Sequence, residues 1–122
     1  MAVKNYRDLD VWKLSKELAK DIYNLTSLYP ADERFGLTQQ MRRAAVSVMS
    51  NIAEGSGRRS TQEFIRFINI ASGSLCELEA QLLLAVDLGY AAAERMELVL
   101  AKADRISKML YALSQSLAKK TA

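Results

Sequence analysis

The side chains best able to do chemistry gather in residues 44–60, AAVSVMSNIAEGSGRRS, where a helical pattern gives way to a glycine-rich turn. Arg58 and Arg59 end this stretch, just before a second helix begins. The positive end of a helix dipole disfavours two arginines, so they need a compensating partner. One interpretation is an ion pair with Glu54 or Glu63. The other is an anion site, because arginines and helix amino termini both favour phosphate.

A second set of polar side chains shares one face of the helix in this stretch. Ser47, Asn51 and Glu54 recur at spacings of four and three, which places them side by side. Ser74 and Glu77 lie one turn apart on the following helix. The pattern predicts a polar network joining the two helices and fixing their register. A ligand site on the same side chains is the alternative.

Enzyme chemistry is poorly supported. The chain has no histidine, so the usual general base near neutral pH is missing, and the Glu-x-x-His motif of di-iron bundles cannot be formed. Cys76 lies between the apolar positions Leu75 and Leu78, which predicts a buried structural thiol rather than a nucleophile. We therefore expect a protein that is not an enzyme and has no cofactor.

Metal binding is also disfavoured. Glu54, Glu77 and Glu79 are the carboxylates that could share a hard cation. Carboxylates on helices are more commonly solvated or paired with arginine. We expect no metal site.

The 122 residues predict one all-α domain, residues 1–122. One proline, five glycines and 50% apolar residues are typical of a soluble helical protein. Apolar side chains recur at spacings of three and four, the period of amphipathic helices. The predicted helices span about 9–28, 37–55, 61–88 and 93–118.

Local signals set the helix ends. Pro30 ends the first helix, because the residue before a proline avoids helical geometry. Gly55 or Gly57 is expected to close the second helix in the left-handed conformation. Ser60 and Glu63 form a capping box that begins the third.

Four amphipathic helices with short connections bury their apolar faces best as an antiparallel up-down-up-down bundle. The third helix carries a sustained seven-residue repeat and additional apolar side chains at both ends. This breadth favours contact with another copy of the chain over a central place in its own bundle. The repeat consists of Phe64, Ile68, Ala71, Leu75, Leu78, Leu82, Ala85 and Gly89.

We expect Arg42 and Arg43 on the exposed side of the second helix. We expect Trp12 to pack at the start of the first helix rather than to stack on a nucleobase. A single cysteine, no basic-apolar leader and no apolar run of about 18 residues favour a cytoplasmic protein without a membrane span.

Several motifs together resemble the 23S rRNA intervening-sequence proteins, a family of four-helix bundles. The resemblance covers nearly the whole chain. The signature is SxxSNIAEGxGR at 47–58, supported by LxVW at 9–12, QxRRAA at 40–45, GSLxELE at 73–79 and LGY at 88–90.

The resemblance implies a left-handed bundle that assembles as a homopentamer around a central channel. Some members are similar to accessory proteins of diversity-generating retroelements, which bind nucleic acid and a reverse transcriptase. With the basic clusters, this predicts a homo-oligomer that binds RNA or DNA. The candidate nucleic-acid-binding residues are Arg42, Arg43, Arg58, Arg59, Lys102 and Arg105.

Two other functions stay open. One is an interaction scaffold that docks a protein partner, such as a reverse transcriptase, without touching nucleic acid. The other is a small-molecule or metal site within the ring, with Glu54 or Glu77 as ligands.

Overall fold

The computed structural model describes residues 5–121. Within these residues the chain is all-α and contains no strand, which confirms the predicted fold class. Residues 1–4 and 122 of the predicted domain lie outside the described part. The elements are the short 3₁₀ helices η1 (Tyr6–Asp8) and η2 (Ala31–Glu33) and the long helices α1 (Asp10–Thr26), α2 (Leu37–Ser56), α3 (Thr61–Asp87) and α4 (Ala93–Thr121).

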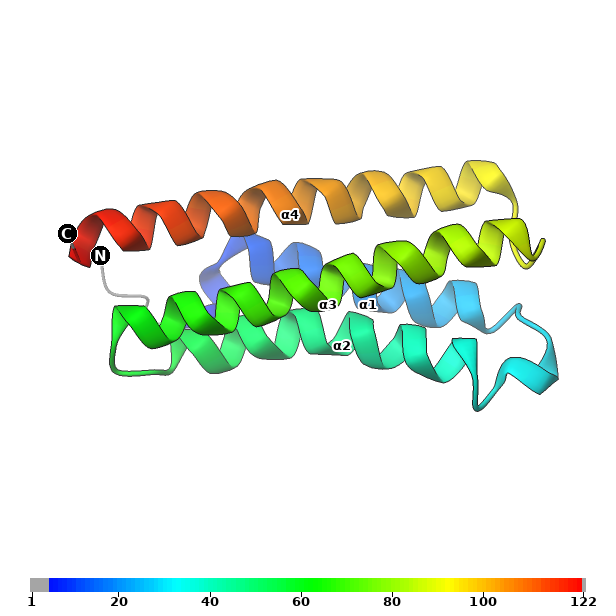
Figure 1. The fold of residues 1–122 in the computed structure, drawn as a ribbon, viewed down its shortest axis with the longest axis horizontal. Helices are drawn as coiled ribbons and strands as arrows, with labels where there is room; N and C mark the ends of the chain where they lie inside the picture. The colour runs from blue at the N-terminus through cyan, green and yellow to red at the C-terminus, as the bar shows by residue number, and fades with distance from the viewer. Residues whose placement is uncertain (1–4, 122) are drawn as a thin grey trace.

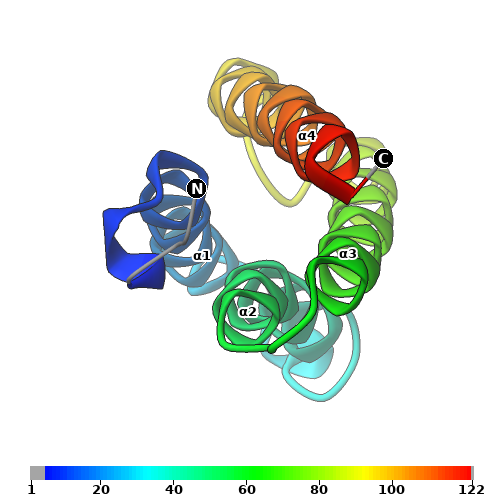
Figure 2. The ribbon, with the colours of Figure 1, turned by 90° about the vertical axis from the view of Figure 1, so that its left-hand side faces the viewer.

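The four long helices lie alongside one another as a bundle (Figure 1). Along the chain, the colours of Figure 1 run rightward in α1, back in α2, rightward in α3 and back in α4, so consecutive helices are antiparallel. Seen from one end, the helices occupy the four corners of the bundle (Figure 2). Each contacts its two neighbours, and the α2–α3 contact is the most extensive. The left-handed sense stays a prediction.

The observed helix ends lie within three residues of the predicted ones. Gly89, with φ +73°, ends α3 in the left-handed conformation. The Tyr90 amide donates to the Ala85 carbonyl and the Gly89 amide donates to the Val86 carbonyl, both at 3.0 Å. This is the Schellman arrangement, which satisfies carbonyls that the helix leaves free.

The predicted left-handed closure of α2 is wrong. Gly57 follows α2 with φ −87°, in right-handed geometry, and Gly89 has the only positive φ among residues 5–121. Gly55 lies inside α2 and is buried. A Cβ at Gly55 would stand 2.7 Å from the Phe67 Cβ and 3.0 Å from the Phe64 Cδ1. Gly55 is therefore needed for the close approach of α3, not for a turn.

The apolar stripes of all four helices meet in one core. Every member of the α3 repeat from Phe64 to Ala85 is buried, and Gly89 is exposed because α3 has already ended. The prediction of a buried Cys76 is wrong, because the thiol is exposed. One residue beyond the buried Leu75, the helix has turned by about 100°, which carries Cys76 out of the core.

Part of the additional apolar surface on α3 is exposed. Phe67 is buried and Val86 is half-buried. Ile70, Leu84 and Leu88 are 40%, 49% and 47% exposed. They lie on one side of α3, here called the α3 stripe, since 14 and 18 residues correspond to about four and five helical turns. The polar residues Ser74, Glu77 and Gln81 lie between them on the same side. The single chain leaves this stripe uncovered.

Replacing Gly55 with alanine should lower the free energy of unfolding by about 1–3 kcal/mol, because the new Cβ overpacks the contact with Phe64 and Phe67. Gly73→Ala is the matched control. It lies in α3 with nothing within 4 Å of the added Cβ, so it should stabilise by about 0.5–1 kcal/mol. Denaturant unfolding at one fixed protein concentration measures both variants. Equal effects of the two substitutions would show that Gly55 does not set the helix spacing.

Candidate functional site

Arg42 and Arg43 leave α2 in different directions because successive helical residues are turned by about 100°. Arg42 is half-buried against α1, which corrects the expectation that it lies exposed. Its Nε donates to the Thr26 Oγ1 at 2.8 Å, and a terminal nitrogen donates to the Tyr23 carbonyl at 3.3 Å. The guanidinium carbon also stands 4.6 Å from the centre of the Tyr23 ring. Arg43 is exposed, as predicted.

These arginines border an open surface cavity of about 600 Å³ where α1, α2 and their connection meet. Two arginines come from α2 and a third, Arg34, comes from the connection. Two aromatic rings, Tyr23 and Phe35, complete the charged and aromatic part of the wall. We call this set the α1–α2 corner; its members are Tyr23, Arg34, Phe35, Arg42 and Arg43.

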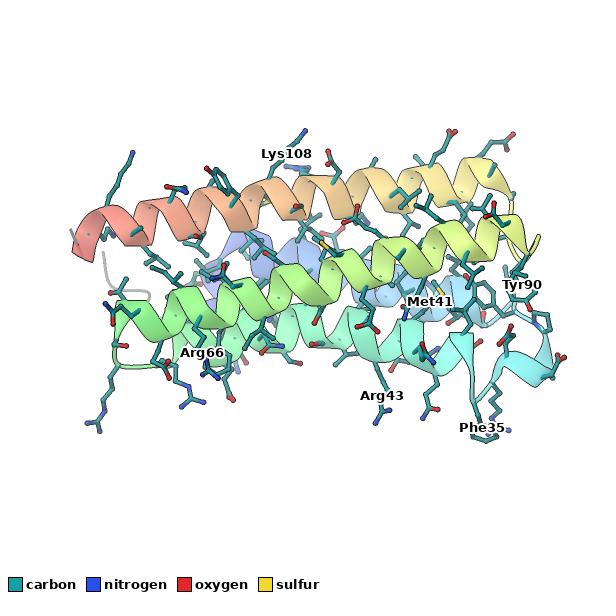
Figure 3. All side chains as sticks on the ribbon, in the orientation of Figure 1. Phe35, Met41, Arg43, Arg66, Tyr90 and Lys108 are labelled. Atoms are coloured by element: carbon teal, nitrogen blue, oxygen red, sulfur yellow. The ribbon has the colours of Figure 1, made fainter. Side chains whose placement is uncertain are left out.

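Phe35 is the most exposed large apolar side chain of the described residues, at 80%. The Arg34 guanidinium carbon lies 5.4 Å from the centre of its ring. Phe35 and Arg43 project to the same side of the bundle, below α2 in the view of Figure 3. Sequence reasoning missed Phe35 and Arg34. The available signal was the adjacent pair Arg34 and Phe35 in a connection between helices, where neither side chain is required for the helical core.

Glu33 positions this connection. Its Oε1 accepts a hydrogen bond at 3.1 Å from the amide of Leu37, which is the first residue of α2. Its Oε2 accepts a hydrogen bond at 2.7 Å from the Tyr90 hydroxyl. A Cβ on Gly36 would stand 2.8 Å from the same Oε1, so a side chain there would require the Glu33 carboxylate to shift. The Tyr90 hydrogen bond, followed by that of the Leu37 amide, lowers the pKa of Glu33.

Tyr90 is in turn held beside a buried ring. The ring centres of Tyr29 and Tyr90 are 5.2 Å apart, and the Tyr29 hydroxyl lies 3.4 Å from the Met41 sulfur. Burial raises the pKa of Tyr29 to about 12. The α1–α2 connection is therefore fixed at its base, while Phe35 stands free at its tip (Figure 3).

Arg58 and Arg59 lie in the α2–α3 turn, at the other end of α2. Fifteen residues separate Arg43 from Arg58, a distance of about 20 Å along the bundle. The Arg58 guanidinium pairs with Glu54 at 3.4 Å and lies 4.8 Å from the Phe67 ring centre. Arg59 is exposed. For Arg58, the ion pair with Glu54 agrees with the ion-pair interpretation.

The basic residues of α4 occupy a third region. The Lys102 ammonium lies 2.6 Å from an Asp21 carboxylate oxygen and 3.7 Å from one of Glu17, both on α1. Arg105 is exposed. Of the six predicted basic residues, the structure brings only Arg42 and Arg43 together in a cavity.

The predicted polar network is divided. The Ser47 and Ser74 hydroxyls are 2.7 Å apart, and the Asn51 amide donates to the Ser47 hydroxyl at 3.0 Å and to its carbonyl at 2.8 Å. Glu54 pairs with Arg58 instead, and Glu77 accepts from the Gln81 amide at 3.1 Å. The serines join α2 to α3.

The acidic and aromatic alternatives can also be placed. Across residues 5–121 no three His, Cys, Asp or Glu side chains are grouped as metal ligands. Glu79 is half-buried. Burial is the larger cause and the nearby charge of Asp104 the smaller cause of its raised pKa.

Trp12 is half-buried with its ring centre 4.9 Å from that of Tyr6, in an edge-on packing contact. In the described part of the chain no helix is both long and apolar enough for a membrane span.

The fold and the helical core define an all-α four-helix bundle protein. The family model described as 23S rRNA-intervening sequence protein matches residues 7–112. The chain belongs to this family, as its motifs predicted.

A solved structure is similar in both sequence and fold. It is a protein of unknown function from the S23 ribosomal protein family of Bacteroides thetaiotaomicron VPI-5482. The TM-score is 0.79 at 30% sequence identity, and the match covers 85% of this chain and 97% of that one. None of the curated proteins matches the chain.

Replacing Glu33 with glutamine should lower the thermal midpoint at neutral pH. The folded pKa of Glu33 lies below its ordinary value, so its carboxylate stabilises the fold above pH 4.5. That contribution disappears as the pH falls through the lowered pKa. The gap between wild type and Glu33→Gln should therefore close on acidification from about pH 7 to about pH 3.

Circular dichroism melts across this range measure the gap. Asp32→Asn is the control, because it removes a neighbouring exposed carboxylate without touching the two hydrogen bonds of Glu33. A gap of constant size at every pH would contradict the role given to the Glu33 carboxylate.

Proposed function

We propose that this chain is a non-enzymatic, cytoplasmic homo-oligomer that binds RNA or DNA at the α1–α2 corner. The observation that carries the proposal is the gathering of three guanidinium groups and two exposed aromatic rings around one open cavity. Arginines bind phosphate oxygens through several parallel hydrogen bonds, and this interaction provides most of the affinity in nucleic-acid binding.

Charge compensation among the described residues is weaker at the corner than in the other two basic regions, where one of the two predicted residues is paired and the other, Arg59 or Arg105, is not. Arg58 and Lys102 have carboxylate partners within the chain. No ion pair within residues 5–121 involves Arg34, Arg42 or Arg43, so their charge is available to an external anion.

The nearby carboxylate of Glu33 forms no ion pair with these arginines in the described residues. Its oxygens accept hydrogen bonds from the Leu37 amide and the Tyr90 hydroxyl instead. Arg42 is already held in place by Thr26 and Tyr23, so little freedom is lost when it binds a phosphate.

Self-association is the second part of the proposal. The exposed stripe of Ile70, Leu84 and Leu88 runs along one helix, and burying such side chains stabilises an interface. We favour a pentamer by analogy with the family.

Removing two cations from the corner should weaken nucleic-acid binding. The double variant Arg34→Gln, Arg43→Gln should lower the affinity for a single-stranded oligonucleotide about tenfold or more at low salt. It should also reduce the slope of log affinity against log salt by about 1.4, because each neutralised phosphate contributes about 0.7. Arg42 is left in place because it also packs against α1.

Fluorescence anisotropy titrations at several salt concentrations measure both quantities. The double variant Arg105→Gln, Lys108→Gln removes the same charge from α4, on the opposite side of the bundle from Arg43, and should bind like wild type (Figure 3). An absence of binding at micromolar protein and low salt would refute the proposed function. A loss with the α4 variant alone would move the site away from the corner.

Light scattering should give a mass of about 68 kDa for the wild type, five times the chain mass of 13.6 kDa. Leu84→Glu should reduce it to the single-chain value, because a buried charge at the interface is strongly unfavourable. Leu98→Glu on α4, at an even more exposed leucine, is the control and should keep the wild-type mass. A wild-type mass of 13.6 kDa would contradict self-association.

A further inference from the structure

The basic surface continues beyond the α1–α2 corner. A second cavity of about 260 Å³ lies along α1 and α2 and is lined in part by Lys16, Lys20 and Tyr23. Tyr23 also lines the first cavity, so the two share a wall. Lys16 and Tyr23 are seven residues apart, or about 10 Å along the helix. The corner and these lysines therefore form a track, which we define as Lys16 and Lys20 together with the α1–α2 corner.

Acidic side chains of α1 are turned away from this track. Glu17 and Asp21 are the acids next to Lys16 and Lys20 in sequence, and both face Lys102 of α4. Glu17 and Asp21 thus lie toward α4, whereas Lys16 and Lys20 line the second cavity. A polyanion lying along the track meets cations on α1, on α2 and in their connection.

Phosphate binding alone does not explain why two aromatic rings are exposed on this track. Phe35 is 80% exposed and Tyr23 is 45% exposed, each beside an arginine. A phenyl ring has neither charge nor a hydrogen-bond donor with which to bind a phosphate, but its flat apolar face can stack on a nucleobase. The bases of a duplex are stacked inside it and cannot reach such a ring, whereas unpaired bases can.

We infer that the track binds single-stranded nucleic acid, with unpaired bases stacking on Phe35 and Tyr23 and phosphates meeting the lysines and arginines. This inference rests on the proposed function and narrows its ligand to unpaired RNA or DNA. Stacking on an aromatic side chain is tolerant of sequence, so the track selects for strandedness rather than for a base sequence.

The test compares fluorescein-labelled oligouridylate and oligothymidylate of about 12 nucleotides with a duplex of the same length. Wild type should bind at least one of the single strands about tenfold or more tightly than the duplex. Phe35→Ala should weaken single-strand binding between about 5-fold and 150-fold, the range for loss of one stacked base, and leave duplex binding unchanged. Phe35→Trp should retain single-strand binding.

Leu28→Ala is the matched control, because Leu28 is a 64% exposed apolar residue of the same connection that lines neither cavity. It should bind like wild type. The pair Lys16→Gln, Lys20→Gln tests the length of the track and should reduce the salt slope for the single strand by about 1.4. An unchanged slope would overturn the extension along α1.

The failure of this inference is distinguishable from failure of the proposed function. Equal binding of single strand and duplex, with no effect of Phe35→Ala, would overturn stacking and leave nucleic-acid binding intact. No binding of any of the three probes would overturn both. Preference for the oligouridylate or for the oligothymidylate would identify the natural strand as RNA or DNA and support the inference in either case.

Discussion

The seven-residue period of apolar side chains on four antiparallel helices is the constraint on which the rest of the molecule depends. Each helix must turn one stripe to the common core, so every other side chain has its direction fixed by its distance from that stripe. Ala44 and Ala45 are buried on α2, and the two preceding arginines must then emerge toward α1 and toward solvent. The core thus decides where the charge of α2 is displayed.

The helical period does not determine the path of the α1–α2 connection. That path is determined by Glu33, whose carboxylate holds the first amide of α2 and the Tyr90 hydroxyl beyond α3. Gly36 leaves room for the carboxylate, and Phe35 between them is directed outward. A rigid base below an exposed aromatic tip limits the entropy lost when a ligand binds. The corner therefore combines a helical surface with a braced connection.

Sequence reasoning could give the fold because the apolar period is local and repeated. It gave the helices to within three residues, and it gave the α3 seam from Phe64 to Ala85. It could not tell which basic residues are already paired, because Lys102 finds Asp21 across 81 positions of sequence. Gly55 looked like a turn residue because its tight contact with Phe67 exists only after α2 and α3 pack. Phe35 was not predicted because a connection has no apolar period, and without that period buried and exposed aromatic residues cannot be distinguished.

The most direct test of a nucleic-acid site at the α1–α2 corner is photo-crosslinking of the wild-type protein to a 4-thiouridine oligonucleotide, followed by trypsin digestion and mass spectrometry. Cleavage after Lys20, Arg34 and Arg42 separates residues 21–34 and 35–42, which carry Tyr23 and Phe35. The account predicts crosslinked nucleotide on one or both of these peptides. Crosslinks confined to the α2–α3 turn or to α4, with none in residues 21–42, would contradict it.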